Sequence, residues 1–321
     1  CVAEAMEKQA ARPGSAVLRN RVVVLSDGQA NLGIQEPDEL SRHAAELRAR
    51  GLLSTAVGIG ESYSDTQLEA IAASGGGRLH HATLPQEIVE LVLGELEELR
   101  ATVIESCDLV GDTPTGFRAE LVGDYAHQRE RGRGRQGDRL TCVVGSLPAG
   151  ASRTLVLKLT CGAGELGDEA AVTVLARYRS AGASVGEEEA VETAPVRCTL
   201  QFATGKDCLA QRRDPARALT AATMWQFALV RAATRLNQDG ELARAAALVE
   251  KEMRYFRRYC EGLPGAETMV AALRRLAASI GEARYAPVMA KEMRVASTKG
   301  MRGERELRVL ARGSWDAHLP K

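Results

Sequence analysis

The first third of the chain alternates between strand-like and helix-like patterns of apolar residues. The predicted strands are short apolar runs at residues 22–25, 52–57 and 78–81. The predicted helices have apolar side chains at helical spacing and cover residues 38–50, 65–73 and 86–99. The first two strands are apolar on both faces, as in parallel sheets, and Ser64 is suited to cap the second helix. Strands and helices that alternate in this way predict an α/β fold with a parallel sheet over residues 1–98.

The apolar period changes to two between about residues 101 and 203. The alternating runs lie at residues 101–110, 117–124, 139–147, 152–160, 171–179 and 196–202. Glycine, proline and charged residues separate these runs. This pattern predicts an antiparallel β-sandwich over residues 99–203. The arginine-rich stretch 129–139 is expected to be a solvated hairpin loop of this domain.

Helical spacing returns after about residue 214. The pattern predicts a helical hairpin from residues 218–236 and 241–259, and a third helix at residues 266–280. The apolar residues of the hairpin are expected to form an internal core. We therefore predict a helical hairpin or bundle over residues 204–297 and a loosely ordered basic tail over residues 298–321.

The strongest candidate for a functional residue is Asp27, which follows the apolar run of the first predicted strand. In an open parallel sheet, ligands bind outside the carboxyl ends of the strands. A carboxylate at that place, with Ser26 before it and Gly28 allowing a tight turn, suits a hard cation such as Mg²⁺. The alternative interpretation is an ordinary Asp-Gly turn, which is a common feature of loops.

Four features in order resemble the C-terminal part of a von Willebrand factor type A (vWA) domain. The strand in RVVVLSDGQANLG ends in Ser-Asp-Gly, and the next strand ends in a Gly-Ile-Gly turn at residues 58–60. A helix then leads to the glycine-rich turn 75–77, which is followed by the last strand and helix. The resemblance covers roughly residues 1–98 and implies a partial, Rossmann-like vWA domain.

In the vWA family, the Asp-Gly pair belongs to the third loop of the metal-ion-dependent adhesion site (MIDAS), and this role carries over to Asp27. Ser26 and Gly28 are implied as neighbouring binding positions. The first loop of the family, Asp-x-Ser-x-Ser, is not in this chain, and neither is the threonine of the second loop. The resemblance therefore implies that Mg²⁺ or another divalent cation binds only the full-length protein and is held poorly by this chain.

The rest of the chain is similar, more weakly, to other vWA proteins. A β-sandwich and helices after the vWA domain resemble bacterial vWA proteins and relatives of the inter-α-trypsin inhibitor heavy chains. The resemblance implies a non-enzymatic protein-binding or scaffold protein, in which the bound metal coordinates an acidic side chain of the partner. Two alternatives stay open: a regulatory vWA subunit of an AAA-type ATPase or metal-chelatase-like complex, and a structural domain with a degenerate metal site.

Composition narrows the classes of partner and the compartment. Lysine plus arginine and aspartate plus glutamate number 42 each, and aromatic residues are 4%, so neither a basic field nor stacking rings predict nucleic-acid binding. No apolar stretch is long enough to span a membrane. The seven cysteines are scattered, which predicts reduced thiols in a cytoplasmic protein. Because residue 1 is a cysteine inside a helix-like pattern, we expect a fragment that lacks its N-terminus.

Other short motifs do not favour catalysis. The Gly58-Ile59-Gly60 turn lacks the third glycine of a dinucleotide-binding loop, and the three glycines 75–77 lack the lysine of a phosphate loop. His80 and His81 are adjacent on a strand, so their side chains are expected to point to opposite faces rather than to share a metal. No Ser/His/Asp or Cys/His set with a supporting context is present, so we expect no enzymatic activity.

The sequence generates one prediction about the parallel sheet. The vWA family places its first strand beside the strand at residues 21–26, so that flank is expected to be open here. Residues 1–98 expressed alone should therefore be unstable or self-associate, while residues 99–203 should fold independently. Sedimentation and thermal unfolding measure this. A monomeric 1–98 fragment with a cooperative unfolding transition would contradict the prediction.

Overall fold

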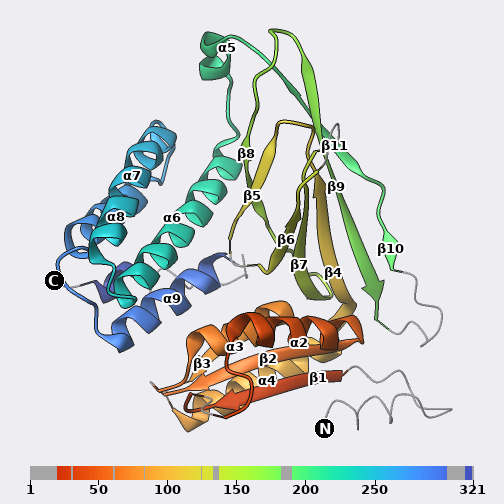
Figure 1. The fold of residues 1–321 in the computed structure, drawn as a ribbon, viewed down its shortest axis with the longest axis vertical. Helices are drawn as coiled ribbons and strands as arrows, with labels where there is room; N and C mark the ends of the chain where they lie inside the picture. The colour runs from red at the N-terminus through yellow and green to blue at the C-terminus, as the bar shows by residue number, and fades with distance from the viewer. Residues whose placement is uncertain are drawn as a thin grey trace.

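The computed structural model describes residues 20–29, 32–60, 62–82, 84–123, 125–132, 137–181, 190–301 and 315–319. These residues form three regions, which we name the α/β layer, the β domain and the helical bundle. In Figure 1 the α/β layer lies below, with the β domain above it and the helical bundle beside both. The mixed architecture confirms the predicted fold class.

The α/β layer has a parallel sheet in the order β1-β2-β3. Its strands are β1 (Asn20–Ser26), β2 (Leu52–Ile59) and β3 (Gly76–Ala82), and both strand pairs are parallel. Its helices are α2 (Pro37–Ala49), α3 (Asp65–Ser74) and α4 (Pro85–Ala101). Ser64 caps α3 as predicted, because its side chain accepts a hydrogen bond from Gln67 N at 3.4 Å.

The helices cover opposite faces of the sheet. His80 contacts Glu95 of α4, whereas the next residue, His81, contacts Tyr63 on the side of α3. Adjacent side chains of a strand point to opposite faces, so α3 and α4 lie on different sides of the sheet. The two histidines thus have separate partners, as their spacing predicts.

The open flank of the sheet lies at β1, which pairs only with β2 among the strands that the structure describes. Large apolar side chains of β1 and of α4 are exposed. They are Leu25 (51% exposed), Val89 (59%), Leu93 (54%) and Leu96 (51%). Edge strands beside apolar surface favour association with other chains.

The β domain consists of two antiparallel sheets that face each other. The larger sheet contains β4 (Thr102–Asp112), β6 (His127–Glu130), β7 (Arg139–Pro148), β9 (Glu169–Ser180), β10 (Val191–Glu192) and β11 (Val196–Gln201). The smaller sheet pairs β5 (Arg118–Val122) with β8 (Val156–Thr160). Ala119, Leu140 and Cys142 form the buried centre between the sheets.

The arginine-rich stretch is only partly a loop. Arg129 and Glu130 belong to β6, which pairs with the start of β7, so the predicted loop begins too early. The strand was missed because its four residues, His-Gln-Arg-Glu, carry no apolar alternation. The Arg129 guanidinium lies 3.6 Å from the Asp138 carboxylate. Arg139 forms a bidentate ion pair with Asp112, with nitrogen–oxygen distances of 2.7 and 3.0 Å.

The helical bundle contains four long helices. They are α6 (Pro215–Gln238), α7 (Leu242–Cys260), α8 (Glu267–Ser279) and α9 (Pro287–Met301), and a short α5 (Gly205–Ala210) precedes them. Fully buried Asn237 links α6 to the segment between α8 and α9. Its amide donates to the carbonyl oxygens of Ile280 and Ala283 at 2.8 Å, and its oxygen accepts from Tyr285 N at 2.8 Å.

The tail predicted to be loosely ordered, residues 298–321, contains two segments of regular structure in the part that the structure describes. Helix α9 continues to Met301, and a 3-10 turn (Trp315–His318) follows near the C-terminus. Trp315 is only 1% exposed in the core of the bundle, and Asp316 forms an ion pair with Arg275. Burial of a large aromatic ring fixes this end of the chain, although basic residues dominate its composition. Residues 302–314 lie outside the described part.

Among the described residues, no helix is both long and apolar enough to cross a membrane. The described cysteines form no disulfide bond with one another. The predicted helix at the start of the chain lies outside the described residues.

A buried carboxylate joins the α/β layer to the β domain. Glu95 of α4 is 3% exposed and forms an ion pair with Arg21 of β1. Its carboxylate also accepts hydrogen bonds from two residues of β3, Arg78 at 3.2 Å and His80 at 2.8 Å. Thr55 of β2 donates a hydrogen bond to it at 3.0 Å. A carboxylate only accepts, so Nε2 of His80 carries the proton in this contact.

The same cluster reaches the β domain. The other terminal nitrogen of Arg21 donates to Ser146 Oγ of β7 at 2.7 Å. Helix α4 also continues directly into β4, and Ala149 N donates to Ala101 O at 2.7 Å across this junction. The two regions are therefore joined by contacts rather than by a free linker.

Charge compensation decides the ionisation of Glu95. Burial alone would raise the pKa of this carboxyl, but the hydrogen bond from His80 and the charges of Arg78 and Arg21 outweigh burial and hold the pKa well below its ordinary value. Stability from such a group is fully present above the pKa of the unfolded chain and is lost as the pH falls toward the folded pKa.

We predict that Glu95→Gln destabilises the protein by about 3–5 kcal/mol at neutral pH, because it leaves the buried guanidinium of Arg21 without its counter-charge. The difference from the parent protein should shrink as the pH falls below about 4. Urea unfolding across pH measures both effects. Glu97→Gln on the same helix, at an exposed position, is the matched control and should change stability by less than about 0.5 kcal/mol. A similar loss in both variants would show that the cluster is not stabilising.

Candidate functional site

The candidate site is the edge of the α/β layer where the parallel strands end. Strand β1 ends at Ser26, and Asp27 follows it with an exposed side chain. Ser26 Oγ donates to the carbonyl oxygen of Gly28 at 2.8 Å, which closes a tight turn below the carboxylate. The three residues named from the sequence therefore lie together at this carboxyl edge of the sheet.

The described residues do not by themselves fit a magnesium ion. Mg²⁺ requires about six oxygen ligands in octahedral geometry, several of which are usually water. Asp27 offers one carboxylate, and Ser26 offers one hydroxyl whose proton is already committed to Gly28. Within the described residues, no group of three or more His, Cys, Asp or Glu side chains is placed to hold a metal. Asp27 would supply one ligand of a larger set.

Apolar side chains are exposed in the loops at this edge. Leu32 and Ile34 follow β1 and are 87% and 41% exposed, and Leu84 follows β3 and is 57% exposed. Isolated exposed apolar residues are common on protein surfaces, but these three follow strands that end at the same edge as Asp27. The edge therefore combines a carboxylate with apolar surface.

The loop after β2 is closed by the helical bundle. Tyr63 of this loop is 3% exposed, and Lys291 of α9 lies 3.5 Å from the centre of its ring. Lys291 Nζ also donates to Tyr63 O at 3.3 Å and lies 3.7 Å from Asp65, which forms a second ion pair with Arg294. Burial raises the pKa of Tyr63 to about 12, although the charge of Arg294 acts in the opposite direction. The phenol is thus neutral at physiological pH.

The glycine motifs of this layer serve packing. Gly58 lies under the ring of Tyr63, so a side chain there would collide with the ring. A side chain at Gly77 would collide with the backbone of Ser54, so glycine at this position allows β3 to approach β2. Both motifs have a steric explanation, and neither requires a bound nucleotide.

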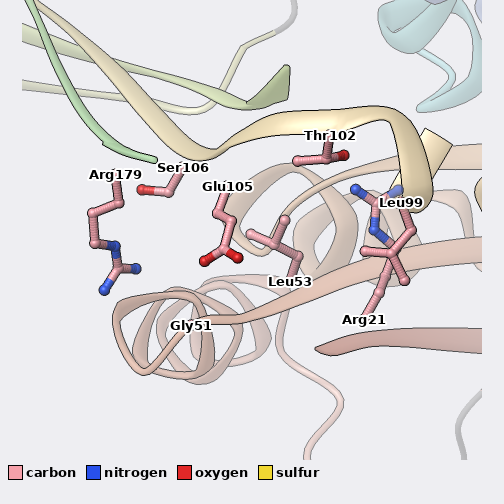
Figure 2. A pocket seen from close by; sticks show the side chains of 8 residues that line it. All are labelled: Arg21, Gly51, Leu53, Leu99, Thr102, Glu105, Ser106 and Arg179. Carbon is pink, nitrogen blue, oxygen red and sulfur yellow. The ribbon is translucent and has the colours of Figure 1, made fainter. Parts of the chain in front are cut away.

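A small cavity lies at the opposite, amino edge of the sheet, where the α/β layer meets the β domain. Figure 2 shows Glu105 and Arg179 extending from the β domain toward Gly51, with Arg21 and Leu99 on the other side. The cavity has a volume of about 20 Å³, which is enough for roughly one water molecule. This cavity is too small for a substrate.

Sequence reasoning missed the contribution of α9 to this edge. The signal was Pro287 at a helix start, followed by Lys291 and Arg294 one turn apart. Nothing local shows that Asp65 neutralises these cations, because α9 and α3 are far apart in the sequence.

Comparisons with known proteins support the fold. No family model and no curated protein matches the chain. A solved structure, von Willebrand factor type A from Catenulispora acidiphila, matches with a TM-score of 0.61 and 17% identity over 93% of this chain and 70% of that chain. At this identity the match establishes the fold alone.

Two other solved structures match with lower TM-scores. The ArnB paralog VWA2 from Sulfolobus acidocaldarius has a TM-score of 0.46 and 14% identity over 94% of this chain and 67% of that chain. Proximal thread matrix protein 1 from the mussel byssus has a TM-score of 0.23 and 27% identity over 29% of this chain and 22% of that chain. Neither TM-score is high enough to add to the argument.

We predict that Asp65→Asn loosens the helical bundle from the α/β layer, because buried Lys291 and partly buried Arg294 lose the carboxylate charge of Asp65. The expected cost is about 2–4 kcal/mol in urea unfolding, with faster amide hydrogen exchange in α9. The matched control is Glu69→Gln, which removes the more exposed ion pair with Arg231 and should cost under about 1 kcal/mol. Equal losses in the two variants, with unchanged exchange in α9, would contradict this prediction.

Proposed function

Since the chain has a von Willebrand factor type A fold, we propose that it is a non-enzymatic protein-binding protein whose contact surface is the carboxyl edge of the α/β layer. Asp27 lies at the centre of this proposal, with Leu32 and Leu84 as apolar contacts. The partner is a protein that presents complementary apolar surface. The β domain and the helical bundle support the layer that carries this edge.

A single observation carries the proposal: exposed apolar side chains and an exposed carboxylate share the edge at which open α/β sheets bind ligands. Leu32 is 87% exposed, which costs solvation free energy unless a partner covers the side chain. Association of proteins is driven largely by such burial, and the polar groups around it determine specificity.

Dependence on a divalent cation is a separate part of the proposal. Asp27 supplies one carboxylate ligand, and a partner carboxylate could supply another oxygen to an ion held with further ligands. The residues described do not complete such a site, so the binding of a protein partner does not rest on the metal. A test with and without chelator separates the two statements.

We predict that a photo-crosslinking amino acid at position 32 captures a partner in cells, and that Asp27→Ala reduces the yield at least about fivefold. The matched control carries the crosslinker at Leu166, which is 72% exposed in the β domain. Circular dichroism should show that Asp27→Ala remains folded, because Asp27 is exposed. Capture of the same proteins from both positions would contradict the proposal.

The captured partner is then purified and its affinity is measured with magnesium and with excess chelator. A loss of at least about tenfold on chelation would support a metal at Asp27, and equal affinity would remove the metal from the mechanism. An AAA-type ATPase as the partner would favour the alternative of a regulatory subunit.

A further inference from the structure

A large groove lies between the β domain and the helical bundle. Its walls are the small sheet of β5 and β8 on one side and helices α6 and α7 on the other. Figure 1 shows β5 and β8 beside α6. The groove has a volume of about 600 Å³, within the range of small-molecule sites. The proposed binding edge of the α/β layer contributes no residue to it.

The helical wall of the groove is aromatic and held in place. The chain has only two tryptophans and six tyrosines, and Trp225, Tyr255 and Tyr259 line this groove. Trp225 makes edge-to-face contacts with Phe256 and Tyr259, with ring centres 5.4 and 5.9 Å apart. Rings that are fixed before a ligand arrives lose little conformational entropy on binding.

The facing wall is aliphatic. Val122 of β5 and Val156 of β8 are paired across the strands and are only partly buried against the bundle. An apolar wall opposite a row of aromatic rings suits a flat apolar group, because both faces of such a group are then removed from water.

The charges at the groove favour an anion. Lys158 of β8 and Lys251 of α7 are exposed lining residues, and neither has an ion-pair partner in the described part of the chain. The lining carboxylate, Glu252, accepts a hydrogen bond from Trp225 Nε1 at 2.9 Å. Glu120, which faces Lys158 across the strand pair, is paired with Arg118. The indole N–H is neutral and leaves the charge of Glu252 in place, so the lining carries two positive charges and one negative charge and is positive on balance.

We propose that this groove binds a small organic anion with a flat apolar body, such as an aromatic carboxylate or sulfonate. The rings and valines take the apolar body, and Lys158 and Lys251 take the acidic group from opposite walls. This site is distinct from the carboxyl edge and does not depend on the function proposed for it.

The test uses two fluorescent probes and the full chain. Anilinonaphthalene sulfonate has a flat apolar body and one negative charge, and phenylnaphthylamine has a similar body without the charge. We expect the sulfonate to bind saturably at one site per chain. The double variant Lys158→Ala/Lys251→Ala should bind the sulfonate about fivefold to thirtyfold more weakly and the neutral probe within about twofold of the parent. Lys206→Ala, at an exposed lysine of α5, should change neither affinity.

The location of binding needs its own variants, because exposed apolar residues along α4 could also attract both probes. Ala221→Trp fills the groove from α6 and should abolish saturable binding of both. Tyr255→Ala removes a side chain that is 56% exposed, so the variant should remain folded. It should lower the affinity for both probes at least about threefold. Undiminished binding of the sulfonate in the lysine double variant, or of both probes in Ala221→Trp and Tyr255→Ala, would overturn the proposal.

Discussion

The arrangement of the α/β layer depends on one buried carboxylate. Glu95 would be costly to bury as an isolated charge, and it becomes tolerable because Arg21, Arg78 and His80 reach it from two strands of the sheet. These bonds fix the height and rotation of α4 over the sheet. Since α4 runs directly into β4, they also fix how the β domain begins. Arg21 extends the same network to Ser146.

A second charged cluster, formed by Asp65, Lys291 and Arg294, covers one of the three loops at the carboxyl edge of the sheet. Lys291 and Arg294 of α9 cover the loop after β2 by contacts with Tyr63 and Asp65. The loops after β1 and β3 keep exposed apolar residues and Asp27. Burial is thus concentrated at one loop of the edge, and the other two loops keep apolar side chains exposed. The proposed protein-binding surface follows from this division.

Much of the fold could be predicted from periodicity. Apolar runs predicted the parallel strands, alternation predicted the β domain, and Ser64 predicted the start of α3, because each signal is local. The polar strand β6 and the basic helix α9 were missed, since their stability comes from distant partners: Lys291 binds a residue 228 positions away. Glu95 had a weak local signal, because it lies one turn from both Leu91 and Leu99 within the apolar stripe of α4. Its acidic neighbours concealed that signal.

The position of Asp27 was predicted because the end of an apolar run is visible in the sequence. Its role was not, since a ligand set or a partner surface is assembled from several loops whose spatial arrangement no local pattern contains. The same holds for the groove lined by Trp225 and Lys158, whose walls come from different regions of the chain. The aromatic spacing of α6 and α7 predicted a core, and only the tertiary structure shows that part of that core faces a groove.

Amide hydrogen exchange of the full chain, with and without its bound protein partner, tests whether the carboxyl edge of the α/β layer is the binding surface. We expect slower exchange in the loops after β1 and β3, around Asp27 and Leu84, and unchanged exchange in the turns of the β domain. Slower exchange confined to the β domain or to the amino edge around Gly51, with none at the carboxyl edge, would contradict it.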